Sequence, residues 1–325
     1  MNHALDVVTF GEAMMLLVAD QAGPLEDAPN FHKRTAGAET NVAIGLARLG
    51  LKVGWASRLG NDSMGRYLLA AMHHEGIDCA HVESDATLRT GLMFKGRVDD
   101  GSDPPVEYHR SGSAASRMGA DDVDAAWLRS ARHLHATGVF PAISASTMAA
   151  ARRSFDAMRG DVAGGRDGIG RNARTISFDP NLRPTLWASP EHMRAAINHF
   201  AERADWVLPG LDEGRFLTGA DTPEAVARHY RECGAALVVV KLGPAGAYFD
   251  GVAGCGYVAG FPVAKVIDTV GAGDAFAVGV ISAMLEGLSV AEAVKRGAWI
   301  GARAVQVRGD TEGLPTRAVL AAAGL

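Results

Sequence analysis

Cysteine is scarce in this sequence, and the cysteines present are scattered. Only three occur among the 325 residues, Cys79, Cys233 and Cys255, and no pair has CxxC spacing. The eleven histidines show no HExxH or similar spacing of metal ligands. A disulfide framework, a zinc site and a redox cofactor are therefore not expected, and a reducing cytoplasm is the expected compartment.

Long apolar runs and an excess of charge of one sign are also lacking. The apolar run 13–19 is too short to span a bilayer and follows acidic residues, so neither a membrane span nor a signal peptide is expected. The net charge of -5 gives no reason to expect nucleic acid or an anionic membrane as a partner. With 48% hydrophobic and 21% charged residues, residues 1–325 can bury a large core as one domain, and small molecules are the expected partners.

Short apolar segments alternate with amphipathic segments along most of the chain. Strands are expected over residues 7–10, 53–57, 133–137, 175–179, 206–208 and 237–241. Helices with one apolar face are expected over residues 41–49, 65–74, 144–158, 191–203, 222–233, 275–285 and 290–305. This order is typical of an α/β fold in which helices cover both faces of a mostly parallel sheet.

Two regions break this alternation, at about residues 15–35 and 90–113. In the second region, segments 90–98 and 106–111 flank a turn-rich stretch, as the two strands of a β-hairpin would. Residues 160–172 hold several glycines among arginines and aspartates and predict a surface loop, for which no function is expected.

The most informative segment is a glycine-rich turn that precedes a helix. Residues 268–274 read Asp-Thr-Val-Gly-Ala-Gly-Asp. Gly271 and Gly273 allow successive N–H groups to point at one spot, where the helix adds its positive end, so an anion is expected there. Asp274 lies beside that anion and is suited to accept a proton from a hydroxyl during phosphoryl transfer. An ordinary turn with Asp274 as a helix cap is the alternative.

Other polar residues are placed to recognise a substrate. Tyr108 and Arg110 are two apart in an expected strand and should share a face, and the planar fork of an arginine suits a carboxylate. Arg183 follows an expected strand, at the sheet edge where open α/β sheets bind ligands. As the alternative, Tyr108 and Arg110 lie on an edge strand and bind no ligand, with Tyr108 packed and Arg110 in solvent. The alternative for Arg183 is an ion pair with a nearby acidic residue.

Four motifs in order resemble the ribokinase-like (PfkB) family of carbohydrate kinases. They are Gly-Glu at 11–12, Ala-Gly-Ala-Glu-Thr-Asn-Val-Ala at 36–43, Arg-Leu-Gly-Asn-Asp-Ser-Met-Gly at 58–65, and the turn 268–274. The chain is most similar to the 2-keto-3-deoxygluconate kinases of that family. The resemblance implies a three-layer α/β fold with a small β-sheet lid over the sugar, formed by the regions near 15–35 and 90–113.

The resemblance also implies roles for residues at these motifs. Asp274 would be the catalytic base, helped by the backbone amides of Gly271, Ala272 and Gly273. The sugar would contact Gly37, Asn41, Tyr108, Arg110 and Arg183, although Asn41 could equally cap the following helix. The nucleotide would lie near Lys241, Gly243, Gly246, Gly271 and Gly273. ATP and Mg²⁺ are the implied cofactors, and a monovalent cation is a further candidate.

One motif departs from the family. Its NxxE segment appears here as Gly210-Leu211-Asp212-Glu213, so glycine replaces the asparagine. Glu213 would organise water around Mg²⁺ without being a direct ligand, and Asp212 is a candidate to compensate for the lost asparagine.

The expected activity is ATP-dependent phosphorylation of 2-keto-3-deoxygluconate to its 6-phosphate. A fructokinase, a ribokinase or another sugar kinase of the family is the alternative, and a noncatalytic sugar-binding protein is the alternative from a different class. Exposed lid edges and an apolar lid face predict a homodimer formed through the lid.

Overall fold

The computed structural model describes residues 3–99, 104–159 and 174–325. The expected surface loop at 160–172 lies outside the described residues. Among the described residues, none of the helices combines the length and the hydropathy needed to cross a bilayer.

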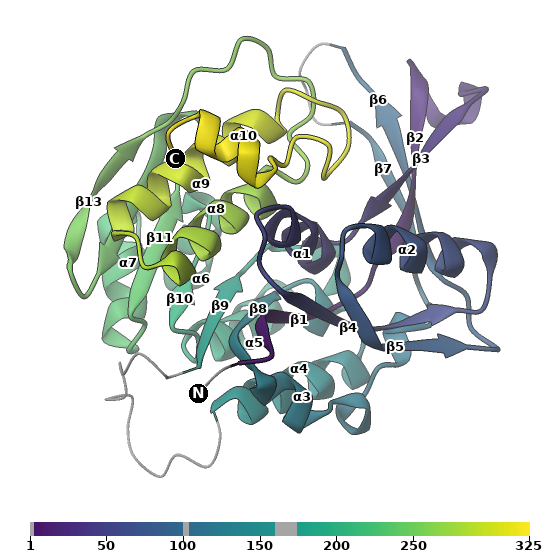
Figure 1. The fold of residues 1–325 in the computed structure, drawn as a ribbon, viewed down its shortest axis with the longest axis horizontal. Coiled ribbons are helices and arrows are strands. Elements are labelled where there is room, and N and C mark those ends of the chain that lie inside the picture. Colours follow the sequence, from purple (N-terminus) through teal and green to yellow (C-terminus); the bar gives the residue numbers. More distant parts are fainter. Residues whose placement is uncertain (1–2, 100–103, 160–173) are drawn as a thin grey trace.

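A large twisted sheet forms the centre of the molecule (Figure 1). In the described part of the chain it has the strand order β13-β12-β11-β10-β9-β8-β1-β4-β5. Neighbouring strands from β11 to β5 are parallel, and β12 and β13 add an antiparallel hairpin at one end. The strands are β1 Leu5–Phe10, β4 Val53–Gly60, β5 Asp78–Asp85, β8 Ala131–Thr137, β9 Thr175–Asp179, β10 Trp206–Val207, β11 Leu237–Lys241, β12 Gly246–Gly251 and β13 Gly254–Ala259.

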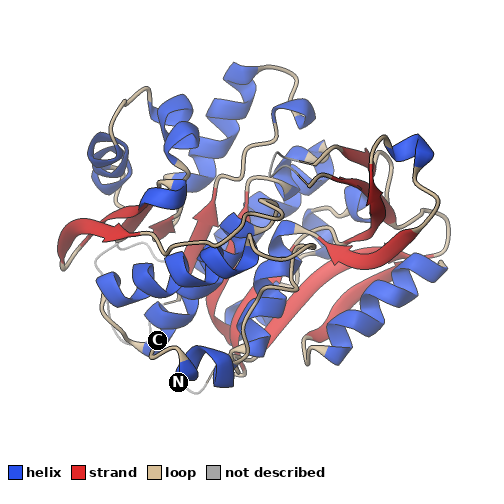
Figure 2. Cartoon of the chain, turned by 90° about the horizontal axis from the view of Figure 1, so that it is seen from above, coloured by secondary structure: helices blue, strands red, loops and turns tan. Residues whose placement is uncertain are grey.

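Helices cover both faces of this sheet because its strands are apolar on both sides. Val7 and Val8, which are adjacent in β1, are both fully buried but belong to two separate cores. One core joins the sheet to α1 Ala38–Arg48, α2 Ser63–His74, α8 Ala272–Glu286, α9 Val290–Ala304 and α10 Arg317–Ala322. The other joins it to α3 Ala125–Ser130, α4 Ala145–Arg159, α5 Pro190–Ala201, α6 Leu211–Thr218 and α7 Pro223–Glu232. Figure 2 shows the strands between the two helix layers.

A small second sheet stands beside the large one and is called the lid sheet below. Its order is β3-β2-β6-β7, from β2 Met14–Ala22, β3 Phe31–Ala36, β6 Gly91–Arg97 and β7 Val106–His109. Strands β6 and β7 pair antiparallel, which confirms the predicted hairpin. Strand β7 ends at His109, so Arg110 follows the strand and is not part of it.

The predicted three-layer α/β fold is confirmed. Every expected strand and helix is present, with boundaries that differ by three residues or fewer. The strands β5, β12 and β13 were not predicted. β5 and β13 are edge strands, which expose many of their residues and lack the apolar runs of central strands, whereas β12 lies between β11 and β13 and is a short segment bounded by glycines. No disulfide joins the three cysteines, all of which are described. The division into one domain with a lid near 15–35 and 90–113 stays a prediction.

Candidate active site

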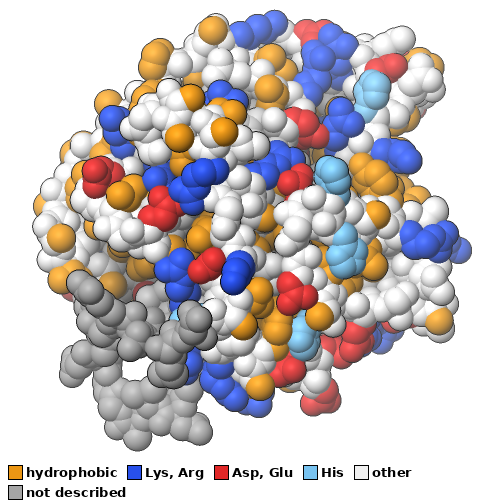
Figure 3. All heavy atoms as spheres, in the orientation of Figure 1, with side chains coloured by type: hydrophobic (Ala, Val, Ile, Leu, Met, Phe, Trp, Pro, Cys, Tyr) orange, Lys and Arg blue, Asp and Glu red, His pale blue; other side chains and the backbone are white. Residues whose placement is uncertain are grey.

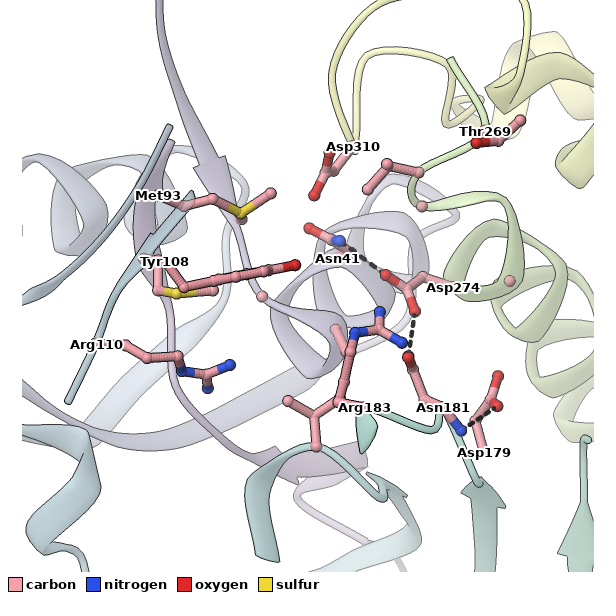
Figure 4. A pocket seen from close by; sticks show the side chains of 18 of the residues that line it. Asn41, Met93, Tyr108, Arg110, Asp179, Asn181, Arg183, Thr269, Asp274 and Asp310 are labelled. Carbon is pink, nitrogen blue, oxygen red and sulfur yellow. Dashed lines mark hydrogen bonds between the residues drawn. The ribbon is translucent and has the colours of Figure 1, made fainter. Parts of the chain in front are cut away.

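A cavity of about 340 Å³ lies where the lid sheet faces the carboxyl ends of the parallel strands. Its walls come from the lid, the start of α1, the ends of β9 and β11, and the turn before α8 (Figure 4). The lining includes ten residues predicted from sequence: Gly37, Asn41, Tyr108, Arg110, Arg183, Glu213, Lys241, Gly271, Gly273 and Asp274. Residues that are far apart in the chain therefore meet at one site.

The glycine-rich turn adopts a conformation that requires glycine. Gly271 has φ 83, in the left-handed region, and a Cβ there would lie 2.8 Å from the backbone oxygen of Asp310. Helix α8 starts at the next residue, Ala272, so its first N–H groups face the cavity edge formed by Gly271 and Gly273. This arrangement is a suitable site for a phosphate group.

Asp274 lies in the first turn of α8, is 7% exposed and lines the cavity. Burial raises the pKa of its carboxyl to about 8, and the neighbouring carboxylates of Asp179 and Asp310 add to the rise. The Asn41 amide and the Arg183 cation act in the opposite direction. A carboxyl with a pKa near the working pH can hold or release a proton, which is what general base catalysis needs.

Two asparagine side chains orient this carboxyl. Asn41 Nδ2 donates to Asp274 Oδ2 at 2.8 Å, and Asn181 Nδ2 donates to Oδ1 at 3.4 Å. Asn41 Oδ1 is buried and has no hydrogen-bond partner among the described residues, so it can accept from a ligand. Asn41 thus contacts the base as well as the cavity, whereas only a contact to the sugar or a helix cap was considered from the sequence.

Two cations flank the cavity on the side of the large sheet. Lys241 Nζ donates to Asp179 Oδ2 at 2.6 Å. Burial by itself would lower the pKa of Lys241, but the carboxylates of Asp179 and Glu213 outweigh it, and the pKa is raised. Arg183 Nη1 donates to the Leu182 oxygen, and its guanidinium forms no salt bridge with a described acid. Figure 4 shows this guanidinium directed towards Asp274.

The lid contributes Tyr108 and Arg110, whose side chains both point into the cavity (Figure 4). Arg110 Nε donates to Glu12 Oε2 at 2.6 Å, and Arg110 Nη2 lies 2.5 Å from the same oxygen. Glu12 is 3% exposed, and its other oxygen accepts from the Ser113 hydroxyl. One edge of the Arg110 fork is therefore fixed by a buried carboxylate. Tyr108 is 47% exposed.

Glu213 lines the cavity, but both of its oxygens accept backbone hydrogen bonds. Oε1 accepts from the Leu182 N–H and Oε2 from the Gly210 N–H, each at 2.8 Å, and the second bond closes the start of α6. Asp212, the candidate to compensate for the lost asparagine, is 93% exposed and pairs with Arg215. The cavity lining does not include Asp212. The roles of Glu213 and Asp212 towards Mg²⁺ stay predictions.

The predicted glycines have different surroundings. Gly37 lines the cavity with φ 147, and a Cβ there would lie 2.6 Å from the backbone oxygen of Glu12. Gly243 is exposed after β11, and Gly246 is buried against the Val258 oxygen, with which a Cβ would collide. The lining of the cavity includes neither Gly243 nor Gly246, so their nucleotide contacts stay predictions. Gly246 is required by the backbone in any case.

Three further lining residues, Asp179, Asn181 and Asp310, were not among the predicted site residues, and neither were Glu12 and Lys95, which contact Arg110 and Asp310 beside the cavity. Asp179 and Asn181 stand in the segment 179–184, Asp-Pro-Asn-Leu-Arg-Pro, which follows an expected strand and from which only Arg183 was predicted to bind the substrate. Asn181 has φ 40, the one positive φ at a non-glycine residue in the described chain, and could not be identified from residue type. Lys95 and Asp310 meet only through contacts across 215 positions of sequence.

Comparison with known proteins assigns the chain and its fold to a family. The family model described as pfkB family carbohydrate kinase matches residues 4–317. The chain belongs to this family. It is 46% identical to 2-dehydro-3-deoxygluconokinase of Bacillus subtilis (strain 168), over 98% of this chain and 94% of the relative.

Solved structures of pfkB kinases share the fold. The PfkB protein from Polaromonas sp. JS666 is 72% identical, with a TM-score of 0.88 over 98% of this chain and all of that one. Fructokinase from Vibrio cholerae O395, in its fructose, ADP and calcium ion bound form, is 27% identical, with a TM-score of 0.82 over 98% of each chain. The chain described above is thus a carbohydrate kinase of the pfkB family.

The face of this pfkB kinase shown in Figure 3 carries basic and acidic side chains that are interspersed. No single-sign field covers that face, in agreement with a small net charge. The lining of the cavity that the lid sheet faces combines carboxylates with Arg110, Arg183 and Lys241.

Proposed function

We propose that this kinase transfers phosphate from ATP to the 6-hydroxyl of 2-keto-3-deoxygluconate. The observation that supports the substrate is the position of Arg110, a lid guanidinium directed into the same cavity as Asp274. A sugar acid has a carboxylate that Arg110 can bind and a hydroxyl from which Asp274 can accept a proton. The similarity to a 2-dehydro-3-deoxygluconokinase supports the same choice.

The proposed mechanism assigns proton transfer to Asp274. Its carboxylate accepts the proton of the attacking hydroxyl, while Asn41 and Asn181 hold its two oxygens in place. The N–H groups at Gly271, Ala272, Gly273 and the start of α8 hold the phosphate that moves, and Arg183 and Lys241 balance its negative charge. Catalysis comes from placement and charge stabilisation, as expected for phosphoryl transfer.

The residues present fit a Mg²⁺ ion that is bound mainly by phosphate oxygens and water. Both Glu213 oxygens already accept backbone hydrogen bonds, and Asp179 is paired with Lys241, which leaves water-mediated contacts for these acids. When bound, Mg²⁺ supplies positive charge to the phosphates. We assign Glu213 to the water around this ion, and ATP to the cavity side formed by Lys241 and the α8 turn.

A substrate panel scored by ADP release tests the proposed function. Keto-deoxygluconate, fructose, ribose and gluconate are compared at equal concentration with ATP and Mg²⁺. The keto acid is expected to give the highest kcat/KM. Faster turnover of fructose or ribose would move the assignment to another sugar kinase of the family, and no ADP release with any sugar would favour a noncatalytic binding protein.

Glu213→Gln is expected to lower turnover by roughly 10-fold or more, because the amide cannot accept from backbone and water as the carboxylate does. Isothermal titration with Mg-ATP and a turnover assay measure the effect. Asp212→Asn, an exposed change on the same helix turn, is the control and should leave both values unchanged. Unchanged binding and unchanged turnover in Glu213→Gln would refute the assigned role.

We also propose that the kinase works in the cytoplasm as a homodimer formed through the lid sheet. The outer side of that sheet carries partly exposed apolar residues, among them Phe31 and Phe94, whose rings are in edge-to-face contact with their centroids 5.4 Å apart. Size-exclusion chromatography with light scattering is expected to give twice the chain mass. A monomer at all concentrations tested would contradict the dimer.

A further inference from the structure

Lys95 is a buried cation on the inner face of the lid sheet. It lies two residues after Met93 in β6, so both side chains project from the same face, and Met93 lines the cavity. Its neighbours across the sheet are Val18 of β2 and Val106 of β7. The side chain is only 1% exposed. A lysine is rarely buried to this extent unless its charge is paired.

The ammonium of Lys95 contacts two aspartates that belong to different loops beside the α8 turn. Nζ lies 2.6 Å from Asp268 Oδ2 and 3.1 Å from Asp310 Oδ1. Asp268 begins the glycine-rich turn and accepts the N–H of Val270. Asp310 places its backbone oxygen against Gly271, at the point where the turn requires glycine. One cation therefore holds both sides of the phosphate-binding turn.

The charges in this cluster depend on one another. Asp268 and Asp310 are each 4% exposed, so two carboxylates share an almost dry space with a single positive charge. Burial by itself would lower the pKa of Lys95, but the carboxylates of Asp310 and Asp268 outweigh it, and the side chain remains an ammonium. Burial raises the pKa of Asp310, and Lys95 acts against this rise. Without a cation at this position, the two carboxylates would repel each other, which would raise their pKa further and favour separation of the loops that carry them.

We propose that Lys95 is a positioning residue that acts as a built-in cation: it fixes Asp268 and Asp310, and thereby the turn that holds the transferring phosphate. The proposal rests on the function assigned above to that turn. The carboxylate pair that a monovalent ion could share is already held by Lys95, so turnover should not need such an ion at this position. Because the lysine belongs to the lid, the lid and the phosphate turn are also assembled together.

Removal of the side chain creates a testable need for an external cation. Lys95→Ala leaves two buried carboxylates and the space of an ammonium group. We expect kcat to fall by roughly 10- to 100-fold, with the KM for the sugar within about threefold of wild type, because the displaced turn holds phosphate and not sugar. Added ammonium or potassium chloride should restore part of the loss, whereas tetramethylammonium chloride, which is too large, should not.

The matched control is Arg34→Ala. Arg34 also joins the lid sheet to the C-terminal loop, through Glu312 at 2.6 Å, but this pair is exposed, at 42% and 32%. Its loss should leave kcat and the cation response as in wild type, because water replaces the contact. A wild-type titration with the same salts at constant ionic strength should show no activation by ammonium or potassium.

Three results would overturn the proposal: Lys95→Ala with turnover within about twofold of wild type, a loss that neither ion relieves, or wild-type activation above about threefold by either ion. If Lys95→Ala does not fold, Lys95→Ala with Asp310→Asn, which restores the net charge of the native cluster, is measured in its place. A kcat that stays at least about tenfold below wild type supports the proposal, and wild-type turnover overturns it. The melting temperature of Lys95→Ala, in which both carboxylates remain, should rise when ammonium or potassium is added. The melting temperature of wild type should not change. This readout tests Lys95 even if the wild-type protein phosphorylates no sugar in the panel.

Discussion

Asp274→Asn is expected to lower kcat by roughly 10²- to 10⁴-fold while the sugar still binds, because the amide keeps the shape of the side chain but cannot accept the proton of the attacking hydroxyl. Turnover is measured by ADP release and sugar binding by isothermal titration. Asp212→Asn makes the same chemical change at an exposed position and is the control. A loss below about tenfold, roughly 1.4 kcal/mol in the barrier, would contradict the assignment of Asp274 as the base.

The pH dependence of the same reaction follows from the raised pKa. A base must be deprotonated to act, so kcat/KM should rise with pH and level off as the pH passes about 8, the pKa of Asp274 in the free enzyme. The charged neighbours that set this value are Asp179 and Asp310, which raise it, and Arg183, which lowers it. The residual kcat/KM of Asp274→Asn should not show this rise with pH.

Protein stability gives a second check that the variant is folded. The pKa of Asp274 is about 8 in the folded state against an ordinary value of 3.8, so the unfolded chain loses this proton at lower pH than the folded chain does. The contribution of Asp274 therefore lowers the free energy of unfolding progressively as the pH rises from about 4 to 8, and this loss stays constant above pH 8. The amide introduced by Asp274→Asn has no proton to lose, so thermal unfolding should show the variant to be more stable than wild type, by a margin that grows over this interval.

Local patterns predicted those parts of the site that are set within a few residues. The turn 268–274 combines two glycines with a following apolar helix, and these residues alone require a tight backbone with exposed N–H groups. Gly37 is similar, since φ 147 at the start of α1 is a property that only glycine supplies easily. Central strands were also predictable where a short apolar segment lies between two amphipathic segments, as in β11, although β8 and β9 also bury the polar residues His133, His135 and Ser177.

Contacts between distant segments were not predictable in this way. Glu12 and Arg110 are 98 positions apart, and neither residue type indicates that one fixes the other. Lys95 lies in a strand of the predicted hairpin, where a lysine side chain is usually in contact with solvent. The fold instead places Asp268 and Asp310 around it. The role of Asn41 as a donor to Asp274 has the same origin, because 233 positions separate the two residues.

The ion pair between Arg110 and Glu12 decides how substrate specificity should be tested. Arg110→Ala alone would leave Glu12, which is 3% exposed, as a buried carboxylate without its cation. Breaking a buried pair in this way costs about 3–5 kcal/mol of folding free energy, so a loss of activity could come from instability. The sharper variant is Arg110→Met combined with Glu12→Gln, which removes both charges and keeps a similar volume.

The double variant is expected to lose roughly 10- to 200-fold in kcat/KM for keto-deoxygluconate, the value of a hydrogen bond to a charged group of about 1.5–3 kcal/mol. A neutral sugar that the wild type accepts should be phosphorylated as before, because it has no carboxylate for the guanidinium to bind. Glu12→Gln alone keeps the guanidinium but leaves it, 8% exposed, without its carboxylate, so thermal unfolding must first show this variant to be folded. It is then the control, in which the preference for the acid over the neutral sugar should survive. Equal losses for the two substrates would show that Arg110 shapes the lid without recognising the acid.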